Sequence, residues 1–362
     1  MRVIGLMSGT SMDGLDGAIA ELEWDGDAVA MTPLVHHERP WPDAVRARLH
    51  AALGPTTAAE LCELDQLVGQ HSAGLASELG PADLVVSHGQ TVHHWVDEAT
   101  ALGTLQLGQP AWIAEQTGAP VISDVRAADI AAGGHGAPLA GILDDLWLAG
   151  ETTRAALNLG GIANVTVVRP DQPPLAFDTG PGNCLLDEAA RRTKGRSHDH
   201  DGELARNGTP REDLLRTLRA DPYYALAPPK STGREHFHLP RELPDASPED
   251  LLATLTELTA ITVAGALAPY APAEVVASGG GVRNPALMRA LRQRLPLTTS
   301  DRRGLPAQAK EAYLMALVGF LSLHQVPLLS GPRVLGRISP GRAPLQLPRP
   351  RARPARLTIR SP

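Results

Sequence analysis

Three glycine-rich segments of the sequence have the residue types that bind phosphate groups. They are residues 7–14, Met-Ser-Gly-Thr-Ser-Met-Asp-Gly, the pair Gly160-Gly161, and the run Gly279-Gly280-Gly281. Phosphate oxygens need convergent N–H donors, and a glycine lets the backbone approach them with no Cβ in the way. Each segment alone is more typical of an ordinary turn. Because all three follow predicted strands at duplicated positions, together they favour nucleotide binding.

The first of these turns supplies polar groups besides its glycines. Thr10 and Ser11 add hydroxyl donors, and Asp13 and Asp16 could hold a hydrated magnesium ion, which prefers oxygen ligands. The turn lacks the Gly-x-x-x-x-Gly-Lys-Ser/Thr pattern and leads into a strand, so neither a P-loop nor a Rossmann fingerprint fits. The candidate nucleotide-binding residues here are Gly9, Thr10, Ser11, Met12, Asp13, Gly14, Leu15 and Asp16.

A candidate catalytic carboxylate lies at the end of a short apolar strand. Asp178 closes the predicted strand 175–178 and precedes Thr-Gly-Pro-Gly and a predicted helix. We expect the dipole at the N-terminus of that helix to keep the carboxylate ionised. An ionised carboxylate can accept a proton from a hydroxyl group or from water. A helix cap or a turn is an equally good interpretation of Asp178.

Three other polar residues are candidates for substrate contacts. His88, in Ser-His-Gly-Gln, lies just past a predicted strand, where α/β proteins form ligand crevices. Arg126 could bind an anionic group, although a surface salt bridge explains it equally well. Glu311 begins an apolar helix, where acids are commonly partners of the helix dipole. Metal binding by His93-His94 or by the run 198–201, His-Asp-His-Asp, is a weaker alternative to surface and exposed-loop positions.

A repeated order of predicted elements positions these residues. A strand, a glycine turn and a returning strand open the chain and recur at 155–168, and further strands and helices follow each time. The chain of 362 residues is also too long for one ordinary core, so we expect an internally duplicated protein with two lobes. Predicted strands span 2–6, 17–22, 28–35 (these three antiparallel), 83–87, 121–124, 155–159, 162–168, 175–178 and 274–277. Predicted helices span 43–79 with a break near 54–55, 183–192, 248–268, a segment from 285, and 309–324; segment 196–246 has little regular pattern.

The composition is that of an ordinary globular protein, with 43% hydrophobic and 20% charged residues. A formal net charge of −7 and an aromatic content of 3% argue against nucleic-acid binding. We find no export signal and no stretch of the roughly 18 apolar residues that cross a bilayer, so we expect no membrane association and a cytoplasmic location. The two cysteines, Cys62 and Cys184, are expected to be buried free thiols, although one disulfide is an alternative.

Six motifs, in order along nearly the whole chain, resemble those of the anhydro-N-acetylmuramic acid kinase family. They lie at residues 5–16, 87–92, 157–164, 177–183, 229–235 and 279–281. The resemblance implies an α/β, duplicated actin/hexokinase-like (ribonuclease H-like) fold with an interlobe cleft, in which ATP and a small carbohydrate would bind. We expect an N-terminal lobe of residues 1–130, with residues 335–362 packed back on it, and a C-terminal lobe of residues 131–334.

The resemblance also implies a reaction. ATP, water and 1,6-anhydro-N-acetylmuramic acid would give ADP and N-acetylmuramic acid 6-phosphate, in peptidoglycan recycling and amino-sugar catabolism, by a homodimeric enzyme. By position, residues 9–16 would line the ATP phosphates, Asp178 would be the catalytic base, and Arg126 and Glu311 would lie near the sugar. The chain departs from the usual family pattern at Gln109, where Asp is usual, and at His135, where Gln is common.

One base is sufficient for this chemistry. Ordinary glycosidases need two carboxylates, one of which protonates the leaving oxygen. In an anhydro sugar the leaving oxygen is the O6 of the substrate itself, and a phosphoryl group can take the place of the proton. Asp178 would then activate the water that attacks C1. Two alternatives remain: a kinase that phosphorylates a simple sugar hydroxyl, and a nucleotide-switched binding ATPase.

Overall fold

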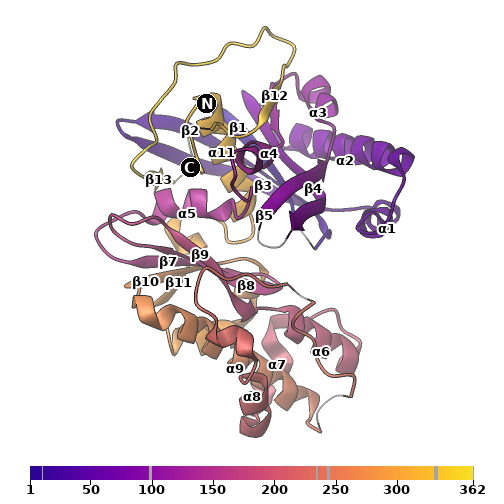
Figure 1. Ribbon diagram of the computed structural model, residues 1–362, viewed down its shortest axis with the longest axis vertical. Coiled ribbons are helices and arrows are strands. Elements are labelled where there is room, and N and C mark those ends of the chain that lie inside the picture. The colour runs from indigo at the N-terminus through magenta and orange to yellow at the C-terminus, as the bar shows by residue number, and fades with distance from the viewer. Residues whose placement is uncertain (10, 98–99, 234, 243–244, 330–332, 362) are drawn as a thin grey trace. The chain divides into compact units, whose positions relative to one another are not determined.

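The computed structural model describes residues 1–9, 11–97, 100–233, 235–242, 245–329 and 333–361, and it contains two compact units (Figure 1). Unit 1 comprises Met1–Trp147 and Ala309–Pro362, and unit 2 comprises Leu148–Gln308. The division differs from the expected lobes, since residues 131–147 and 309–334 belong to unit 1. Residues 309–334 do so because the helix α11 (Lys310–Leu323) packs on the first sheet. A Cβ added to Gly5 would lie 2.0 Å from the carbonyl oxygen of Ala312, so the strand and the helix are in direct backbone contact.

Unit 1 is built on a sheet of eight strands in the order β12-β6-β4-β1-β2-β3-β13, with β5 paired to β4. The predicted antiparallel arrangement of the first three strands is confirmed, and β4 and β6 run parallel to β1. The strands are β1 (Arg2–Ser8), β2 (Gly14–Asp25), β3 (Ala28–Pro40), β4 (Leu84–Asp97), β5 (Thr100–Leu107), β6 (Val121–Ser123), β12 (Arg337–Ser339) and β13 (Leu357–Ile359).

The helices of unit 1 pack apolar residues against this sheet. The predicted break in the first helical region is confirmed, and the second helix begins where the Thr57 side chain accepts a hydrogen bond from the N–H of Glu60. Helix α11 is almost entirely buried and so belongs to the core of the unit. The helices are α1 (Asp43–Ala51), α2 (Ala58–Leu79), α3 (Pro110–Thr117), α4 (Ala127–Ala131), α5 (Ala140–Leu148) and α11.

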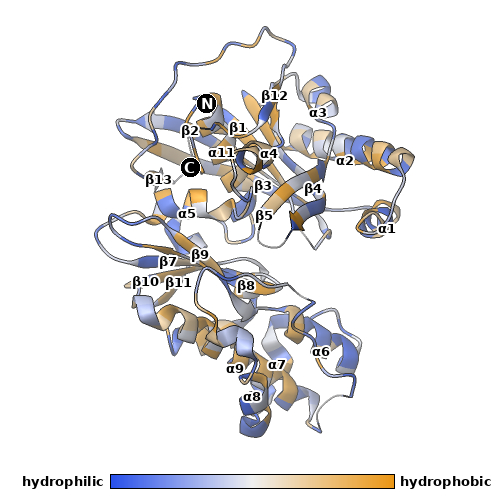
Figure 2. Cartoon of the chain, viewed as in Figure 1, coloured by the Kyte–Doolittle hydropathy of each residue, from blue (hydrophilic) through white to orange (hydrophobic). Residues whose placement is uncertain are grey.

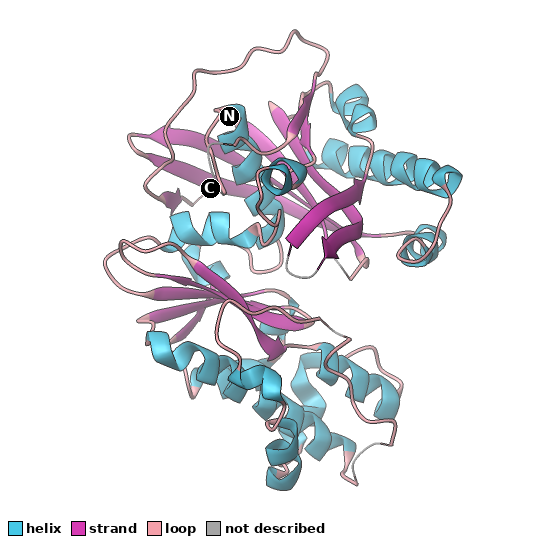
Figure 3. Cartoon of the chain, viewed as in Figure 1, coloured by secondary structure: helices cyan, strands magenta, loops and turns pink. Residues whose placement is uncertain are grey.

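Unit 2 repeats the same strand topology with five strands in the order β11-β10-β7-β8-β9 (Figure 3). As in unit 1, three consecutive strands pair antiparallel, and two later strands extend the sheet parallel to the first of them. The strands are β7 (Arg154–Leu159), β8 (Ile162–Val168), β9 (Leu175–Pro181), β10 (Glu274–Ser278) and β11 (Leu297–Thr299). This repeated order confirms the duplicated α/β fold expected from the sequence.

The helices of unit 2 include two in the segment that the sequence predicts to be irregular. These are α7 (Glu203–Asn207) and α8 (Glu212–Leu218), which pack with the long helix α9 (Pro248–Leu267) around buried Leu204, Leu215 and Leu255. The hydropathy colouring of Figure 2 shows the contrast between the apolar α9 and the largely polar α8. The other helices are α6 (Cys184–Lys194) and α10 (Pro285–Arg292), with short 3₁₀ turns at His200–Gly202, Pro222–Ala225, Ala268–Tyr270, Gly280–Arg283 and Ser300–Arg303.

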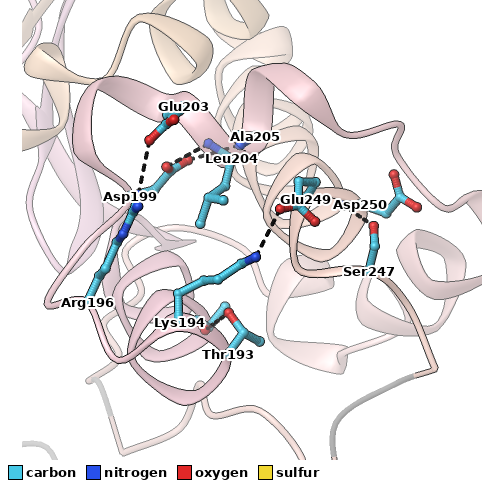
Figure 4. A network of polar contacts seen from close by, with 11 residues as sticks. Thr193, Lys194, Arg196, Asp199, Glu203, Leu204, Ala205, Ser247, Glu249 and Asp250 are labelled. Carbon is cyan, nitrogen blue, oxygen red and sulfur yellow. Dashed lines mark hydrogen bonds and ion pairs between the residues drawn. The ribbon is translucent and has the colours of Figure 1, made fainter.

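The His-Asp-His-Asp run at 198–201 has a structural role that was not expected. Asp199 is buried, and its carboxylate accepts hydrogen bonds from the N–H groups of Leu204 and Ala205 at 2.9 and 3.0 Å (Figure 4). Asp199 therefore holds the start of α7 instead of lying in an exposed loop. Among the described residues, no group of three or more His, Cys, Asp or Glu side chains could hold a metal ion.

Two other expectations from composition need correction. Within the part of the chain that the structure describes, Pro248–Tyr270 is long and apolar enough to span a membrane, which the sequence analysis did not find. Most of this segment is buried inside unit 2, as in a core helix. Cys62 is exposed and Cys184 is only partly buried, so neither is the fully buried thiol that was expected.

Candidate active site

The first glycine turn joins β1 to β2 and is fixed by two buried side chains. Oγ of Ser8 lies 2.7 Å from the carbonyl oxygen of Gly14 and 2.6 Å from Oε1 of Gln90, and it accepts a hydrogen bond of 3.3 Å from the indole N–H of Trp41. The amide of Gln90 donates to the carbonyl oxygen of Gly9 at 3.3 Å. The Gly9 end of the turn is therefore tied to β4, and the Gly14 end to Ser8 of β1.

Within this turn, the backbone of Met12 is left-handed, with φ of 53°, and its side chain is buried. A left-handed methionine is costly, and burial of its side chain offsets part of that cost. Gly9, Ser11 and Leu15 complete the described part of the candidate phosphate-binding turn, and Thr10 lies outside the described residues.

The two acidic residues of the turn have different environments. Asp13 is exposed, and its carboxylate forms an ion pair of 2.9 Å with Arg46. Asp16 is partly buried on β2, and burial together with the nearby Glu38 and Glu311 carboxylates raises its pKa to about 7. A carboxylate that other acids surround is a better candidate for a cation ligand than one already paired with a guanidinium group. The structure therefore favours Asp16 over Asp13.

Because the pKa of Asp16 is raised, replacing Asp16 by a neutral residue should increase the stability of the protein, by an amount that depends on pH. Because the folded-state pKa of about 7 lies above the ordinary aspartate pKa of 3.8, ionisation of Asp16 reduces the free energy of unfolding progressively as the pH rises between these two values. In metal-free buffer, Asp16→Asn should therefore be more stable than the wild type at about pH 8, and this advantage should shrink towards about pH 5. Urea unfolding at both pH values measures the difference in the free energy of unfolding between the variant and the wild type. The same difference at both pH values would contradict the raised pKa of Asp16.

His88, a buried residue inside β4, pairs with the partly buried Arg126, which follows the end of β6. Nε of Arg126 donates to Nε2 of His88 at 2.9 Å, so Nδ1 carries the proton and donates to the carbonyl oxygen of Gly89 at 2.8 Å. Burial and the nearby guanidinium lower the pKa of His88 to about 4, which keeps its ring neutral. Both ring nitrogens are thus engaged within the chain. His88 is better placed to orient Arg126 than to bind a substrate itself.

Arg126 is held at a second point, where Nη1 donates to the carbonyl oxygen of Gly136 at 2.7 Å. Its charge acts on Glu311, which is the first acidic residue of α11. Burial raises the pKa of Glu311, and the positive charges of Lys310 and Arg126 offset part of that rise. Three of the residues predicted from sequence are thus connected in unit 1, since the charge of Glu311 acts on both Asp16 and Arg126.

A pocket of about 240 Å³ opens beside His88 and is lined by residues of β4, β5 and the end of β6. The buried hydroxyl of Ser87 has no hydrogen-bond partner among the described residues, which leaves it available to a bound molecule or to water. Asp124, with a left-handed φ of 52°, forms an ion pair of 2.8 Å with Arg337 in the same wall. The pocket is lined by Asp65, Ser87, His88, Gly89, Thr104, Leu105, Gln106, Leu107, Gly108, Pro110, Ser123, Asp124, Ala127 and Arg337.

In unit 2 the glycine segments after β7 and β10 lie next to each other. The reason is that Ser278 and Asn158, at the ends of these strands, pair in a parallel register. A Cβ added to Gly279, whose φ is +86°, would lie 2.4 Å from Oδ1 of Asn158, and one added to Gly281 would lie 2.7 Å from Cβ of Leu159. No larger residue fits at either position without movement of the opposite turn.

The carbonyl oxygens of Gly160 and Gly161 accept hydrogen bonds from the chain just before α6. The N–H groups of Asn183 and Gly182 donate to them at 2.8 and 2.9 Å. The N-terminus of α10 is capped by the side chain of Asn284, which accepts hydrogen bonds from the N–H groups of Ala286 and Leu287. The structure thus brings two predicted glycine segments, Gly160-Gly161 and 279–281, into one cluster. Gly280 lies in the middle of the second segment.

Asp178 lies on β9, the edge strand of the second sheet. Asn164 pairs with Asp178 and Ala163 with Gly180, so Thr179 is an extra residue that forms a β-bulge. Bulges re-aim neighbouring side chains and are common beside active sites. Oδ2 of Asp178 accepts hydrogen bonds from the Ser231 hydroxyl at 3.0 Å and from the Thr232 N–H at 2.9 Å.

This environment corrects the expected electrostatics of Asp178. The helix that follows begins at Cys184 and does not use Asp178 as its cap. Burial raises the pKa of Asp178, and hydrogen bonds from the Thr232 N–H and the Ser231 hydroxyl offset part of that rise. The donors that favour its ionised form therefore come from residues 231–232. A raised pKa also makes the carboxylate a stronger proton acceptor than an exposed aspartate.

The comparisons with known proteins agree along the whole chain. The sequence profile of the anhydro-N-acetylmuramic acid kinases matches residues 1–340. The anhydro-N-acetylmuramic acid kinase of Streptomyces coelicolor is 50% identical, over 99% of this chain and 98% of that protein. That of Rhodococcus erythropolis is 47% identical, over 94% of each. The chain belongs to the anhydro-N-acetylmuramic acid kinase family.

Among solved structures, an activator of the 2-hydroxyisocaproyl-CoA dehydratase from Clostridium difficile with bound ADPNP aligns with 88% of this chain and 94% of its own. The TM-score is 0.42 and the sequence identity 16%.

The two departures from the usual anhydro-N-acetylmuramic acid kinase pattern occupy different positions. Oε1 of Gln109 accepts a hydrogen bond of 3.3 Å from the N–H of Ala111 and caps α3, which begins with Pro110. The N–H of Gly108, next to it, donates to the carboxylate of Asp65 at 2.7 Å. Gln109 therefore caps α3, as an aspartate at this position could also do. His135 is exposed between two glycines.

Sequence reasoning missed the residues that support the predicted kinase-family site. Ser231 and Thr232 fall in a motif that carries the family resemblance, but no spacing rule connects them to Asp178, more than fifty positions away. Ser8 and Gln90 are likewise joined only by the parallel register of β1 and β4. In both cases the only signal was a polar residue inside a family motif.

Proposed function

We propose that this protein transfers the γ-phosphoryl group of ATP to O6 of 1,6-anhydro-N-acetylmuramic acid while water opens the anhydro bond. The products are N-acetylmuramic acid 6-phosphate and ADP. The observation that carries the proposal is the family match over residues 1–340, which includes a partly buried Asp178 held by two hydrogen-bond donors.

The reaction needs one general base. Asp178 accepts a proton from a water molecule, whose oxygen forms a bond to C1 of the sugar as the bond from C1 to O6 breaks. The electron pair of that bond goes to O6, which forms a bond to the γ-phosphorus atom, and ADP leaves with the electrons of the broken phosphoanhydride bond. Because the phosphoryl group takes the place of a proton on O6, no second carboxylate is required as an acid.

The glycine segments are the proposed phosphate-binding elements. In unit 1 this is the turn from Gly9 to Asp16, and in unit 2 it is the cluster of Gly160-Gly161 and 279–281. Backbone N–H groups and glycine's small size suit negatively charged oxygens at these positions. Phosphoryl transfer depends mainly on positioning and on stabilisation of charge, which these elements would supply.

Magnesium is the proposed metal, and Asp16 fits it better than Asp13 does. Mg²⁺ usually binds one or two carboxylates together with phosphates and water, so a three-ligand protein site is not needed. Burial raises the pKa of Asp16 most, the nearby Glu38 and Glu311 carboxylates raise it further, and a bound cation would relieve their repulsion. When bound, Mg²⁺ would neutralise charge on the transferred phosphoryl group. Asp13 is already paired with Arg46.

Arg126 and Glu311 are the proposed sugar-binding residues, with His88 as the support of Arg126. The guanidinium could bind the carboxylate of the lactyl group of the substrate, for which its paired N–H donors are suited. Glu311 could accept hydrogen bonds from the sugar's hydroxyl or amide groups. We further propose a cytoplasmic homodimer that acts in peptidoglycan recycling and amino-sugar catabolism.

The test of this function is product analysis. Purified protein with ATP, Mg²⁺ and 1,6-anhydro-N-acetylmuramic acid should release ADP and a monophosphorylated open-ring sugar in equal amounts, as measured by mass spectrometry. A phosphorylated sugar that keeps its anhydro ring would indicate the simple hydroxyl kinase. ADP release that does not depend on any sugar would indicate a nucleotide-switched ATPase and would overturn the proposal.

A further inference from the structure

A covering segment, residues 229–232, lies along the outer edge of β9 beside Asp178. The N–H of Asp178 donates to the carbonyl oxygen of Lys230 at 3.0 Å. The Ser231 hydroxyl and the Thr232 N–H return two hydrogen bonds to one oxygen of the Asp178 carboxylate. The backbone and the side chain of Asp178 are therefore both attached to this segment.

A second set of contacts fixes the covering segment itself. The ammonium of Lys230 donates to the carbonyl oxygens of Tyr223 and Tyr224 at 3.1 and 3.3 Å and lies 4.6 Å from the centre of the Tyr223 ring. The Tyr223 hydroxyl donates to the carbonyl oxygen of Asp178 at 2.9 Å. Together, these contacts form a closed network of interactions that runs from Asp178 to the covering segment, on to Tyr223 and back to Asp178. Tyr223 is buried, so it anchors this network in the core of unit 2.

The two carboxylate oxygens of Asp178 are not equivalent. Oδ2 has both donors, and no donor to Oδ1 is found within the described residues. Two hydrogen bonds to one oxygen fix the rotation of the carboxylate and leave the other oxygen able to accept a proton. An oriented base is more effective than a freely rotating one, because the proton acceptor is already in place.

We propose that Ser231 and Tyr223 are positioning residues that orient Asp178 so that Oδ1 receives the proton of the attacking water. This inference rests on the proposed function, in which Asp178 is the base. Neither residue needs to touch the sugar or ATP for this role.

Among the residues that the structure describes, two titratable groups lie close to Asp178. They are Tyr223, whose pKa is raised by burial and by the Asp178 charge, and Lys230, whose pKa is lowered by burial. The direct effect on the pKa of Asp178, apart from burial, comes from the donors at Thr232 and Ser231. Loss of the Ser231 donor should therefore raise the pKa of Asp178 and move the acid side of the activity profile to higher pH.

The test compares Ser231→Ala with Ser231→Thr, which keeps a hydroxyl. In Ser231→Ala we expect kcat to fall about tenfold, since one hydrogen bond to a charged group is lost, while KM for sugar and ATP stays within about twofold. The acid limb of the kcat profile should move up by about one pH unit. Ser231→Thr should restore most of both. Tyr223→Phe should lower kcat in the same way without a change in KM.

Ser231 is exposed, so its replacement should leave the fold intact, and thermal unfolding of each variant checks this. An unchanged kcat and an unchanged acid limb in Ser231→Ala would overturn the inference. So would a raised KM with normal kcat, because it would place Ser231 in direct substrate contact. If the wild type fails to phosphorylate the anhydro sugar, the proposed function itself has failed. Normal wild-type turnover with an unaffected Ser231→Ala removes only the positioning role.

Discussion

Asp178→Asn should lower kcat by a factor on the order of 10²–10⁴ while leaving the binding of ATP and the anhydro sugar nearly unchanged. Asparagine has almost the same shape, and its carbonyl oxygen can still accept the hydrogen bonds from Ser231 and Thr232. It cannot take a proton from water, so the loss should fall on the chemical step. Steady-state kinetics, with ligand affinities from calorimetry, measure the two effects separately.

Asp201→Asn is the matched control for this variant, because Asp201 is an exposed aspartate of the same unit. It should turn over at the wild-type rate. Turnover of Asp178→Asn within about threefold of wild type would exclude Asp178 as the base, since a positioned base typically contributes far more than that.

Lys310→Met should reduce the free energy of unfolding by about 3–5 kcal/mol. The ammonium of Lys310 forms an ion pair of 2.5 Å with Asp144, and both side chains are buried. Removal of the cation leaves the Asp144 carboxylate without its counter-charge in a medium of low dielectric constant. Urea unfolding followed by tryptophan fluorescence measures the loss, because Trp147 lies 5.8 Å from the ammonium.

The double variant Lys310→Met/Asp144→Leu separates the cost of an unpaired charge from the value of the pair. It should recover most of the lost stability, since replacing both buried partners by apolar residues is often close to neutral. Lys194→Met is the surface control: its partner Glu249 lies 3.2 Å away in a solvent-exposed pair (Figure 4), and the change should leave the free energy of unfolding nearly unchanged. Equal losses for Lys310→Met and Lys194→Met would contradict the burial argument.

The repeated strand order could be predicted because each strand has a local signature. The run 162–168 is apolar and β-branched between two turns, and the structure has β8 at these residues. The tight turns between the first three strands allow only antiparallel pairing, which the structure confirms. Strand lengths were harder to predict. β4 starts as a buried strand at Leu84 and continues to Asp97, and its part from Gln90 onward forms a hairpin with β5 in which polar side chains weaken the apolar signal.

The unit boundaries could not be predicted because they depend on contacts between distant segments. Nothing local in residues 309–324 indicates which sheet this apolar helix will cover. Its partner is selected by Gly5 and Gly319, which allow contact between the helix and strands β1 and β4. The buried pair of Lys310 and Asp144 depends on the same long-range packing.

Asp178 shows the corresponding limit at the candidate site. Its position at the end of an apolar strand marked it as a candidate, but its neighbours in the sequence suggested the wrong source of stabilisation. The helix that follows it was expected to hold the charge, whereas the donors come from residues 231–232. Hydrogen bonds between residues so far apart have no periodic signal in the sequence.

The central claim is that water, and not a sugar hydroxyl, is the nucleophile whose attack accompanies phosphoryl transfer. The most direct measurement is the reaction in ¹⁸O-labelled water, followed by mass spectrometry of the sugar product. As a control for exchange of the anomeric oxygen with solvent, unlabelled product is incubated in the same water. We predict one ¹⁸O atom at the anomeric carbon of N-acetylmuramic acid 6-phosphate and none in its phosphate group. A phosphorylated sugar without label, or label only in released phosphate, would contradict the account.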